Sequence, residues 1–247
     1  MSAAEISYPT YLHLDRLLEL QRPQSTPEHP DELLFIVVHQ ASELWFKVLL
    51  HEFDQLIAHL EQDDAQAAVF TMQRINSLVG LVSHELRALD TLPPQRFKQF
   101  RGYLGSSSGS QSAQFRAIEA TSGLRESHFM AALQEHGEIP AVVQRALGRP
   151  TLQALFLAML SRRGVTLEAL YTEPQHGLLL MLAEAFLEYE QGFAQWRFLH
   201  VQLVERIIGP MTGDGWDAGG EVPQQDDPAT LLPRTLGGAG PPLRGVR

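Results

Sequence analysis

Apolar residues recur every three to four positions along most of this chain, the spacing that gathers them on one face of an α-helix. Alternation with a period of two, which indicates β-strands, is nearly absent. The pattern predicts long helices over residues 31–60, 64–92 and 177–208, and shorter helices over residues 10–21, over residues 95–104 and between residues 114 and 164.

Clusters of proline, glycine and serine separate the predicted helices. Residues 22–30 contain three prolines, and the helix over 64–92 is followed directly by Pro93 and Pro94. Residues 106–112 read S-S-S-G-S-Q-S. Proline removes a backbone donor and glycine adds conformational freedom, so we expect each of these stretches to be a loop.

The composition changes sharply at Gly209, beyond which glycine, proline, aspartate and threonine replace the periodic pattern. We therefore predict a single all-helical domain over residues 1–209. Residues 210–247 are predicted to form a Gly/Pro-rich C-terminal loop and tail that is partly disordered. Long helices with short connections form bundles, and bundles hold cofactors between facing helices.

Charge and apolar content narrow the choice of partner and location. The chain has 19 Lys and Arg against 29 Asp and Glu, a net charge of −10. This balance argues against nucleic-acid binding, which needs a basic face, and against an anionic membrane surface. The N-terminus lacks the pattern of a signal peptide, and the apolar run at 178–182 is soon interrupted by Glu184 and Glu188. We expect a cytoplasmic protein with no nucleic-acid or membrane partner.

The chain contains no cysteine and ten histidines. A disulfide scaffold, a cysteine nucleophile, a Cys-ligated iron–sulfur cluster and a covalently attached c-type haem are therefore excluded. A ferritin-like di-iron site needs two Glu-x-x-His motifs. Glu173 and His176 have that spacing, but Pro174 lies between them and no convincing second copy exists. The zinc-protease motif H-E-x-x-H is also absent.

His200 lies in the second half of the last predicted helix. By their spacing, Phe193, Trp196, His200 and Val204 share one face of it. A histidine on such an aromatic stripe can coordinate haem iron through one ring nitrogen, while a neighbouring acceptor orients the other. The same spacing suits an ordinary buried histidine, and the residues alone leave both interpretations open.

His39 and Arg101 are the other candidate site residues. Phe35 precedes His39 by one helical turn, so an aromatic surface and a hydrogen-bonding imidazole share a face that suits an indole or a phenol. Arg101 follows Phe97 and Phe100 and precedes a Gly/Ser loop, where its guanidinium could clamp a carboxylate. An ordinary buried histidine and an exposed arginine at a helix end are the alternatives.

Four segments together resemble one known family. Residues 31–47 read D-E-L-L-F-I-V-V-H-Q-A-S-E-L-W-F-K, residues 97–119 contain F-x-x-F-R-x-x-L-G-x-S-S-G-x-Q-S-x-Q-F-R-x-I-E, residues 196–209 contain W-R-F-L-H-x-x-x-V-x-R-x-I-G, and residues 8–15 contain Y-P-T-Y-L-x-L-D. In this order, over most of residues 8–209, they resemble the tryptophan 2,3-dioxygenases. The resemblance implies an all-α helical bundle that encloses a b-type haem.

The resemblance also implies roles for the candidate residues. His200 matches the proximal axial ligand of the haem iron. His39 matches the catalytic distal histidine that contacts the indole N–H, with Phe35 as the aromatic wall beside it. Arg101 matches the residue that clamps the carboxylate of the amino acid, with Phe100 alongside.

Further positions of the family pattern concern the cofactor and the assembly. Ser108 and Gly109 match loop residues near the iron-bound oxygen, and Trp196 belongs with them to the expected cofactor-binding set. Tyr8 and Tyr11 match tyrosines that close the pocket of a neighbouring subunit. The resemblance therefore implies a homotetramer with interlocked N-terminal segments.

Three departures from the family pattern concern the substrate. Phe97 stands where many members have a tyrosine whose hydroxyl helps hold the carboxylate, and Ser110 replaces a phenylalanine. Residues 213–219 read G-D-G-W-D-A-G in place of G-T-G-G-S-S-G. Asp214 thus takes the place of a threonine that meets the substrate's ammonium and carboxylate, where an aspartate attracts the first and repels the second. Trp216 adds bulk to the same loop.

The leading hypothesis is a haem b enzyme, active with Fe2+, that uses O2 to open the indole ring of L-tryptophan or a substituted tryptophan and gives an N-formylkynurenine-type product. One alternative is a related haem oxygenase that inserts a single oxygen atom into a tryptophan derivative, giving a 2-oxindole or hydroxylated product in a biosynthetic pathway. A second alternative is a haem-binding helical protein without turnover. The sequence does not identify the reductant of the iron.

Overall fold

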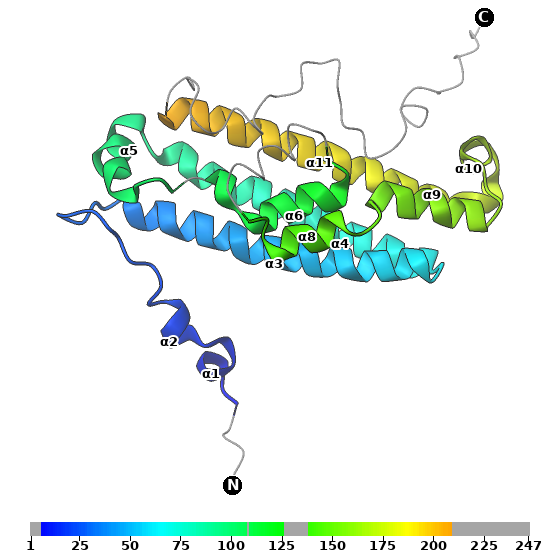
Figure 1. The fold of residues 1–247 in the computed structure, drawn as a ribbon, viewed down its shortest axis with the longest axis horizontal. Coiled ribbons are helices and arrows are strands. Elements are labelled where there is room, and N and C mark those ends of the chain that lie inside the picture. The colour runs from blue at the N-terminus through cyan, green and yellow to red at the C-terminus, as the bar shows by residue number, and fades with distance from the viewer. Residues whose placement is uncertain (1–5, 108, 126–137, 209–247) are drawn as a thin grey trace, which may run out of the picture.

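The computed structural model describes residues 6–107, 109–125 and 138–208 (Figure 1). Within these ranges every regular element is a helix. The three long helices are α3 (Glu32–Glu61), α4 (Ala65–Leu86) and α11 (Gly177–Ile208). The shorter elements are α1 (Tyr8–Leu12), α2 (Leu14–Leu17), η1 (Arg87–Thr91), α5 (Pro94–Arg101), η2 (Gly102–Leu104), η3 (Gly109–Gln111), α6 (Ala113–Ser122), α8 (Ala141–Leu147), α9 (Leu152–Arg162), α10 (Leu167–Thr172) and η4 (Pro174–His176). The all-α prediction is confirmed, and the predicted tail over 210–247 lies outside the described residues.

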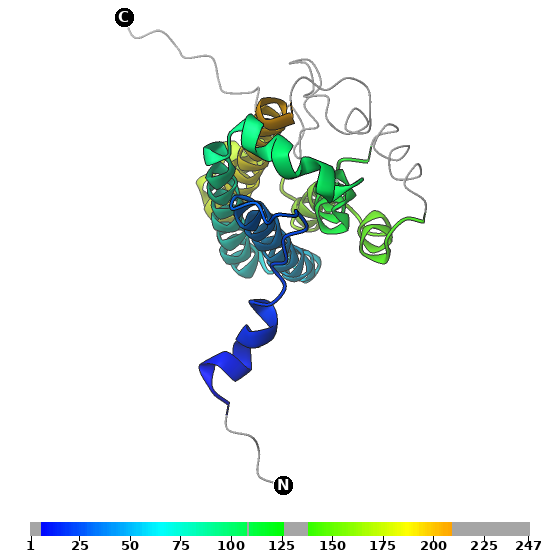
Figure 2. The ribbon, with the colours of Figure 1, turned by 90° about the vertical axis from the view of Figure 1, so that its left-hand side faces the viewer.

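The three long helices lie side by side along the long axis of the molecule (Figures 1 and 2). α4 packs between α3 and α11 and has extensive contacts with both. α6 and α9 pack on α3 as well, and α8 packs on α6. α5 lies at the end of the bundle where α3 begins and α11 ends, and it contacts α11. This end of the bundle carries the candidate site.

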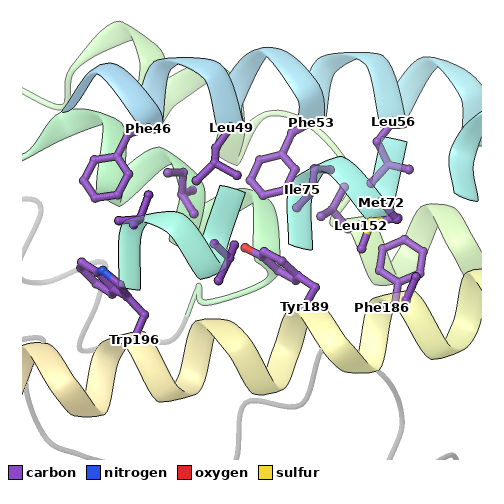
Figure 3. Close-up of a cluster of buried hydrophobic side chains, with 14 of the residues drawn as sticks. Phe46, Leu49, Phe53, Leu56, Met72, Ile75, Leu152, Phe186, Tyr189 and Trp196 are labelled. Carbon is purple, nitrogen blue, oxygen red and sulfur yellow. The ribbon is translucent and has the colours of Figure 1, made fainter. Parts of the chain in front are cut away.

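The core follows from the apolar spacing within each long helix. Figure 3 shows side chains from α3 (Phe46, Leu49, Phe53, Leu56), α4 (Met72, Ile75) and α11 (Phe186, Tyr189, Trp196) meeting in one buried cluster. Burying a large apolar side chain stabilises the folded chain by roughly 1.5–3 kcal/mol. The periodic positions therefore hold the bundle together.

α3 is buried unevenly along its length. From Phe46 to Leu60 each turn supplies at least one buried apolar residue, whereas Val38 is the single buried residue between Glu32 and Phe46. Phe35 lies in that less covered half. The end of the bundle that carries the candidate site is therefore also the end where α3 leaves side chains within reach of a ligand.

Side-chain caps explain where several of the helices begin. The capping residues, each accepting a backbone N–H three positions on, are Asp64 (3.0 Å), Ser112 (3.1 Å), Thr151 (3.2 Å) and Thr166 (3.1 Å). Each such cap satisfies a donor that the helix leaves without an internal partner, and replacing it by alanine costs about 0.5–2 kcal/mol. These caps fix the starts of α4, α6, α9 and α10.

The single helix predicted over residues 10–21 is wrong. The chain forms two short helices, α1 and α2, separated by His13, whose backbone is left-handed with φ 51°. Neither helix buries a residue, and both project away from the bundle (Figures 1 and 2). Helices of this length are marginal without a packing partner, so the leucine spacing alone does not continue the helix.

One boundary and one short helix also differ from the sequence prediction. The helix expected over residues 64–92 is α-helical only to Leu86 and tightens into the 3-10 helix η1 before Pro93. α10 was not predicted, because six residues are too few to display a helical period. The helix over 177–208 matches α11 at both ends.

Among the described residues, α3 is the one helix long and apolar enough to cross a membrane by length and composition. This apolar stretch is longer than the run at 178–182 in α11, on which the prediction of no membrane partner rests. α3 packs along α4 on one side and against α6 and α9 on another. Core helices of soluble proteins meet the same length and composition test.

Candidate active site

Residues from α3, α5 and α11 meet at the end of the bundle where α3 begins. α3 supplies Phe35 and His39, α5 supplies Phe97, Phe100 and Arg101, and α11 supplies Trp196 and His200. Pro93 ends the preceding helical segment, and α5 begins at Pro94 and turns the chain across the end of the bundle.

An aromatic wall joins α3 to α5. The ring of Phe35 lies 5.4 Å from that of Phe97 and 5.8 Å from that of Phe100, centroid to centroid. Phe97 and Phe100 are buried and meet edge to face at 5.2 Å. These separations fall in the range where aromatic rings attract each other. Buried in this cluster, Phe97 contributes apolar surface and no hydroxyl.

His39 is held by its own helix. Its Nδ1–H donates to the backbone oxygen of Phe35 (2.7 Å), and its ring lies 4.2 Å from the Phe35 ring. Solvent reaches the ring, yet desolvation by the surrounding protein lowers the pKa of His39, against the opposing effects of that hydrogen bond and of the Glu43 carboxylate. The neutral ring protonated on Nδ1 leaves a lone pair on Nε2, which can accept a hydrogen bond from an indole N–H.

His200 stacks on Trp196. Their ring centroids are 5.1 Å apart with an interplanar angle of 9°, and Trp196 is packed in turn against Phe115 at 4.8 Å. Burial lowers the pKa of His200 to about 4, and the charges of His39 and Arg116 act in the same direction. The imidazole is therefore neutral near pH 7, the form that can donate a lone pair to a metal. The two histidines lie near enough to influence each other's charge.

Trp196 carries a buried indole N–H that has no hydrogen-bond partner within the described part of the chain. A buried donor left unsatisfied costs about 1–3 kcal/mol, so such a group points to an acceptor that is not a protein atom described here. Haem carries two propionates, and its ring is apolar. A neutral histidine, an aromatic stack and an unpaired buried donor on one helix face fit that group.

Arg101 ends α5 and is half-buried. Its Nη1 donates to the backbone oxygen of Gly105 (2.9 Å), and within the described residues this is its only side-chain hydrogen bond. Gly105 has φ +56°, a left-handed backbone that glycine adopts without strain. The turn at Gly105 thereby holds the guanidinium by one nitrogen and leaves its other donors for a carboxylate.

A charged cluster on α6, whose Arg116 influences the pKa of His200, was not predicted from the sequence. Arg116 Nη1 donates to Glu119 Oε2 (2.7 Å), and Arg197 Nε lies 4.0 Å from Glu119 Oε1. Glu119 is 2% exposed. The signal was available, because Arg116 and Glu119 are fixed letters of the 97–119 segment, but one sequence does not reveal which helix face they occupy.

Of the remaining predicted site residues, two lie outside the described part of the chain and the others lie on η3 and α1. Ser108 and Asp214 lie outside the described residues. Gly109 begins η3, which follows α5 and η2 in the chain. Tyr8 and Tyr11 are 74% and 71% exposed on α1, away from the site (Figure 1).

Comparisons with known proteins identify the family of the chain. The sequence model of one family, described as tryptophan 2,3-dioxygenase, matches residues 1–142. A tryptophan 2,3-dioxygenase of Kineococcus radiotolerans is 36% identical over 87% of this chain and 84% of its own length. Those of a Bradyrhizobium species and of Serratia proteamaculans are 37% and 33% identical, over 87% and 94% of this chain and 85% and 91% of theirs. The resemblance seen in the sequence is confirmed, and the chain belongs to the tryptophan 2,3-dioxygenase family of oxidoreductases.

Proposed function

We propose that the chain is a haem-dependent dioxygenase that opens the indole ring of L-tryptophan, or of a substituted tryptophan, with O2 to give an N-formylkynurenine-type product. The observation that carries the proposal is the aromatic end of the bundle, where α3 supplies His39 packed on Phe35 and α11 supplies His200 stacked on Trp196. Family membership supports ring opening over insertion of one oxygen atom and over a protein without turnover.

In this proposal His200 holds haem b through a ring nitrogen, with Trp196 packed against the imidazole. The family is haem-dependent. Bound in the ferrous state, haem supplies the activation of O2 for addition across the indole C2–C3 bond. Gly109 and Ser108 belong to the loop expected beside the haem. The protein's own contribution is binding, orientation and exclusion of water.

The substrate is held at both ends. The free donors of Arg101 bind the carboxylate, and Nε2 of His39 accepts the indole N–H. The partly buried ring of Phe35 supplies the flat surface against which the indole stacks, and the buried ring of Phe100 packs edge-on behind it. Fixing both ends of one molecule presents the pyrrole edge in a single orientation, which lowers the entropic part of the barrier. Indole is already electron-rich, so His39 orients and does not need to act as a strong base.

We also propose that the chain assembles as a homotetramer whose N-terminal segments interlock. The N-terminal segment exposes large apolar side chains with no cover in one chain: Ile6, Tyr8, Tyr11, Leu12, Leu18 and Leu20. The outer face of α3 does the same through Leu33, Val37 and Leu44. Apolar surface of this size on a projecting segment is typical of a contact between protein chains. We also propose that the protein is located in the cytoplasm.

The decisive experiment is incubation of anaerobically reduced, haem-loaded protein with L-tryptophan and its methylated analogues under 18O2. Ring opening adds both atoms of one O2 molecule to the substrate, and the mass of the product reads this directly. A product carrying one labelled atom would favour the single-oxygen alternative. Ferrous haem protein whose spectrum does not respond to any aromatic amino acid would favour a protein without turnover.

Haem ligation is tested separately by His200→Ala, which should purify without haem. The matched control is His51→Ala, which removes an exposed imidazole from α3 farther along the bundle. This variant should purify with its haem. Undiminished haem content in the His200→Ala protein would refute the ligand assignment.

A further inference from the structure

The loop between α2 and α3 is bound to α5 and η2 by a row of three contacts. Three contacts join them: Asp31 with the Arg96 guanidinium through both carboxylate oxygens, His29 Nε2 with Gln99 Oε1 (3.0 Å), and the backbone oxygen of Thr26 with the hydroxyl of Tyr103 (2.9 Å). As the residue number falls along the loop, it rises along the helix. The two segments therefore run antiparallel, and a charged, bidentate pair sits at one end.

These contacts lie on a different face of α5 from the site. Arg96, Gln99 and Tyr103 are spaced by three and four residues and share one side, while Phe97 and Arg101 lie around the helix from them. Phe100 contacts both the loop and α3. The centroid of its ring lies 5.1 Å from that of His29 and 5.8 Å from that of Phe35. The loop thus holds α5 from outside while α5 presents its other face to the site.

The loop is anchored in turn to the first residue of α3. Glu32 is fully buried, and its carboxylate accepts the backbone N–H of Gln24 (2.6 Å) and of Ser25 (3.1 Å) as well as the Ser25 hydroxyl. The same hydroxyl oxygen accepts the backbone N–H of His29 (2.8 Å). A buried carboxylate with several donors is satisfied only while the loop keeps this path. One continuous hydrogen-bonded chain therefore links the helix of His39 to the helix of Arg101.

We propose that residues 24–32 act as a clamp that fixes α5 relative to α3, with Arg96, Gln99 and Tyr103 as positioning residues for selection of the amino-acid carboxylate. The identity of the ligand rests on the function proposed above. His39 and Arg101 meet opposite ends of one small molecule from two separate helices, so their separation has to match its length. A displacement of about 1 Å at such a site can cost 10²-fold in rate.

The clamp is tested with Arg96→Met, which removes the bidentate pair and keeps much of the side chain's bulk. Arg149→Met is the matched control. Arg149 forms an ion pair with Asp54 farther along α3, and the Arg96 and Arg149 side chains are 46% and 42% exposed. The ligands are L-tryptophan and tryptamine, which differ only in the carboxylate, and their affinities are read from the Soret band of haem-loaded protein. Hydrogen exchange of residues 94–104 reports on α5 without any ligand.

We expect Arg96→Met to reduce the ratio of the affinities for L-tryptophan and tryptamine about tenfold. The reason is that loss of the charge-assisted pair with Asp31 loosens the helix that carries Arg101. Exchange should quicken in residues 94–104 and stay unchanged in the buried parts of α4 and α11. Arg149→Met should leave both measurements at wild-type values. Should Arg96→Met fail to fold, Tyr103→Phe removes a single oxygen and should shift both measurements in the same direction by less.

Two results would overturn the clamp: unchanged exchange in residues 94–104, or quickened exchange with an unchanged preference between the ligands. Wild-type protein that binds neither ligand would overturn the proposed function and the selection role with it. In that case the exchange experiment still decides whether the loop holds α5, so failure of the clamp and failure of the function are distinguishable.

Discussion

At the scale of single residues, the proposed site gives two neutral imidazoles different tasks. His39 keeps its Nδ1–H on the Phe35 carbonyl and presents a lone pair, while His200 lies flat against Trp196 with its pKa lowered to about 4. In each case the neighbouring residue on the same helix, one turn away, sets the orientation of the ring. The spacing of these pairs could be read from the sequence, and their tautomer and protonation could not.

The orienting role proposed for His39 predicts how the His39→Ala variant responds to substrates. Turnover of L-tryptophan should fall about 10- to 100-fold, because the indole N–H loses its acceptor. 1-Methyltryptophan has no N–H to offer, and the smaller alanine leaves room for its methyl group. Its rate relative to that of L-tryptophan should therefore rise in the variant. Steady-state rates with both substrates measure this, and an equal loss for both would contradict the hydrogen bond.

Tyr189 predicts a stability effect at a buried polar pair. Its hydroxyl lies 2.6 Å from Ser122 Oγ, and burial raises its pKa far above the usual tyrosine value. Tyr189→Phe leaves the serine hydroxyl buried without this partner and should lower the free energy of unfolding by about 1–2 kcal/mol. Ser122→Ala should cost a similar amount. Because both changes break one bond, urea unfolding of the double variant should show a smaller loss than the sum of the two.

At the scale of elements, backbone conformation separates two glycines that have equal space around them. A Cβ added to Gly80 or to Gly105 would meet nothing within 4 Å, but Gly80 lies inside α4 while Gly105 has φ +56°. Gly80→Ala should raise the free energy of unfolding by about 0.5–1 kcal/mol through helix propensity. Gly105→Ala should lower it by about 1 kcal/mol. Urea titrations that gave both changes the same sign would refute this reasoning.

The start of α3 predicts a pH dependence. Burial would raise the pKa of Glu32, but hydrogen bonds from Gln24 and Ser25 outweigh it, and the pKa is lowered overall. A lowered folded-state pKa stabilises the fold above the unfolded value of about 4.3 and loses that contribution as pH falls through the folded value. The stability gap between wild type and Glu32→Gln should therefore narrow as the pH is lowered from about 5 to about 3. Urea midpoints across that range measure it, and a constant gap would argue against the buried carboxylate.

The long helices were predictable, and the arrangement of the short ones was not. α3 and α11 repeat the apolar spacing over many turns, so the period is unmistakable, and Pro93 marks the end of the second long segment. The break at His13 depends on the absence of a packing partner, which no local pattern records. The ties between residues 26–31 and 96–103 join residues 65 to 77 positions apart, a separation at which one sequence carries no pairing signal. The motif residues of the site could be identified because they match the pattern of a known family. The contacts of the clamp could not, because no such pattern says which distant residues meet.

At the scale of the whole molecule, the projecting N-terminal segment is the main support for the proposed assembly. α1 and α2 contribute nothing to the core, since neither buries a residue, and the segment returns to the bundle only near Gln21, which bonds to Gln40 on α3 (2.5 Å). A segment that stabilises nothing in its own chain but exposes tyrosines and leucines gains from contact with another chain. In the proposed assembly, loss of the N-terminal segment would therefore weaken the contacts between chains and leave the fold of each chain intact.

Removal of residues 1–18 tests this expectation. The shortened chain should keep its helical content and its haem, because the residues lost have no role in the bundle core or at His200. If the chain assembles through this segment as proposed, the mass of the shortened protein by light scattering should fall below that of the full-length protein. Its affinity for L-tryptophan should also weaken, because in that proposal Tyr8 and Tyr11 of a neighbour close the pocket. A matched variant, Tyr8→Phe with Tyr11→Phe, keeps the apolar surface and should retain the assembly. If the shortened chain kept both its oligomeric mass and its affinity, the N-terminal segment would have no part in the site, and the pocket would be complete within one chain.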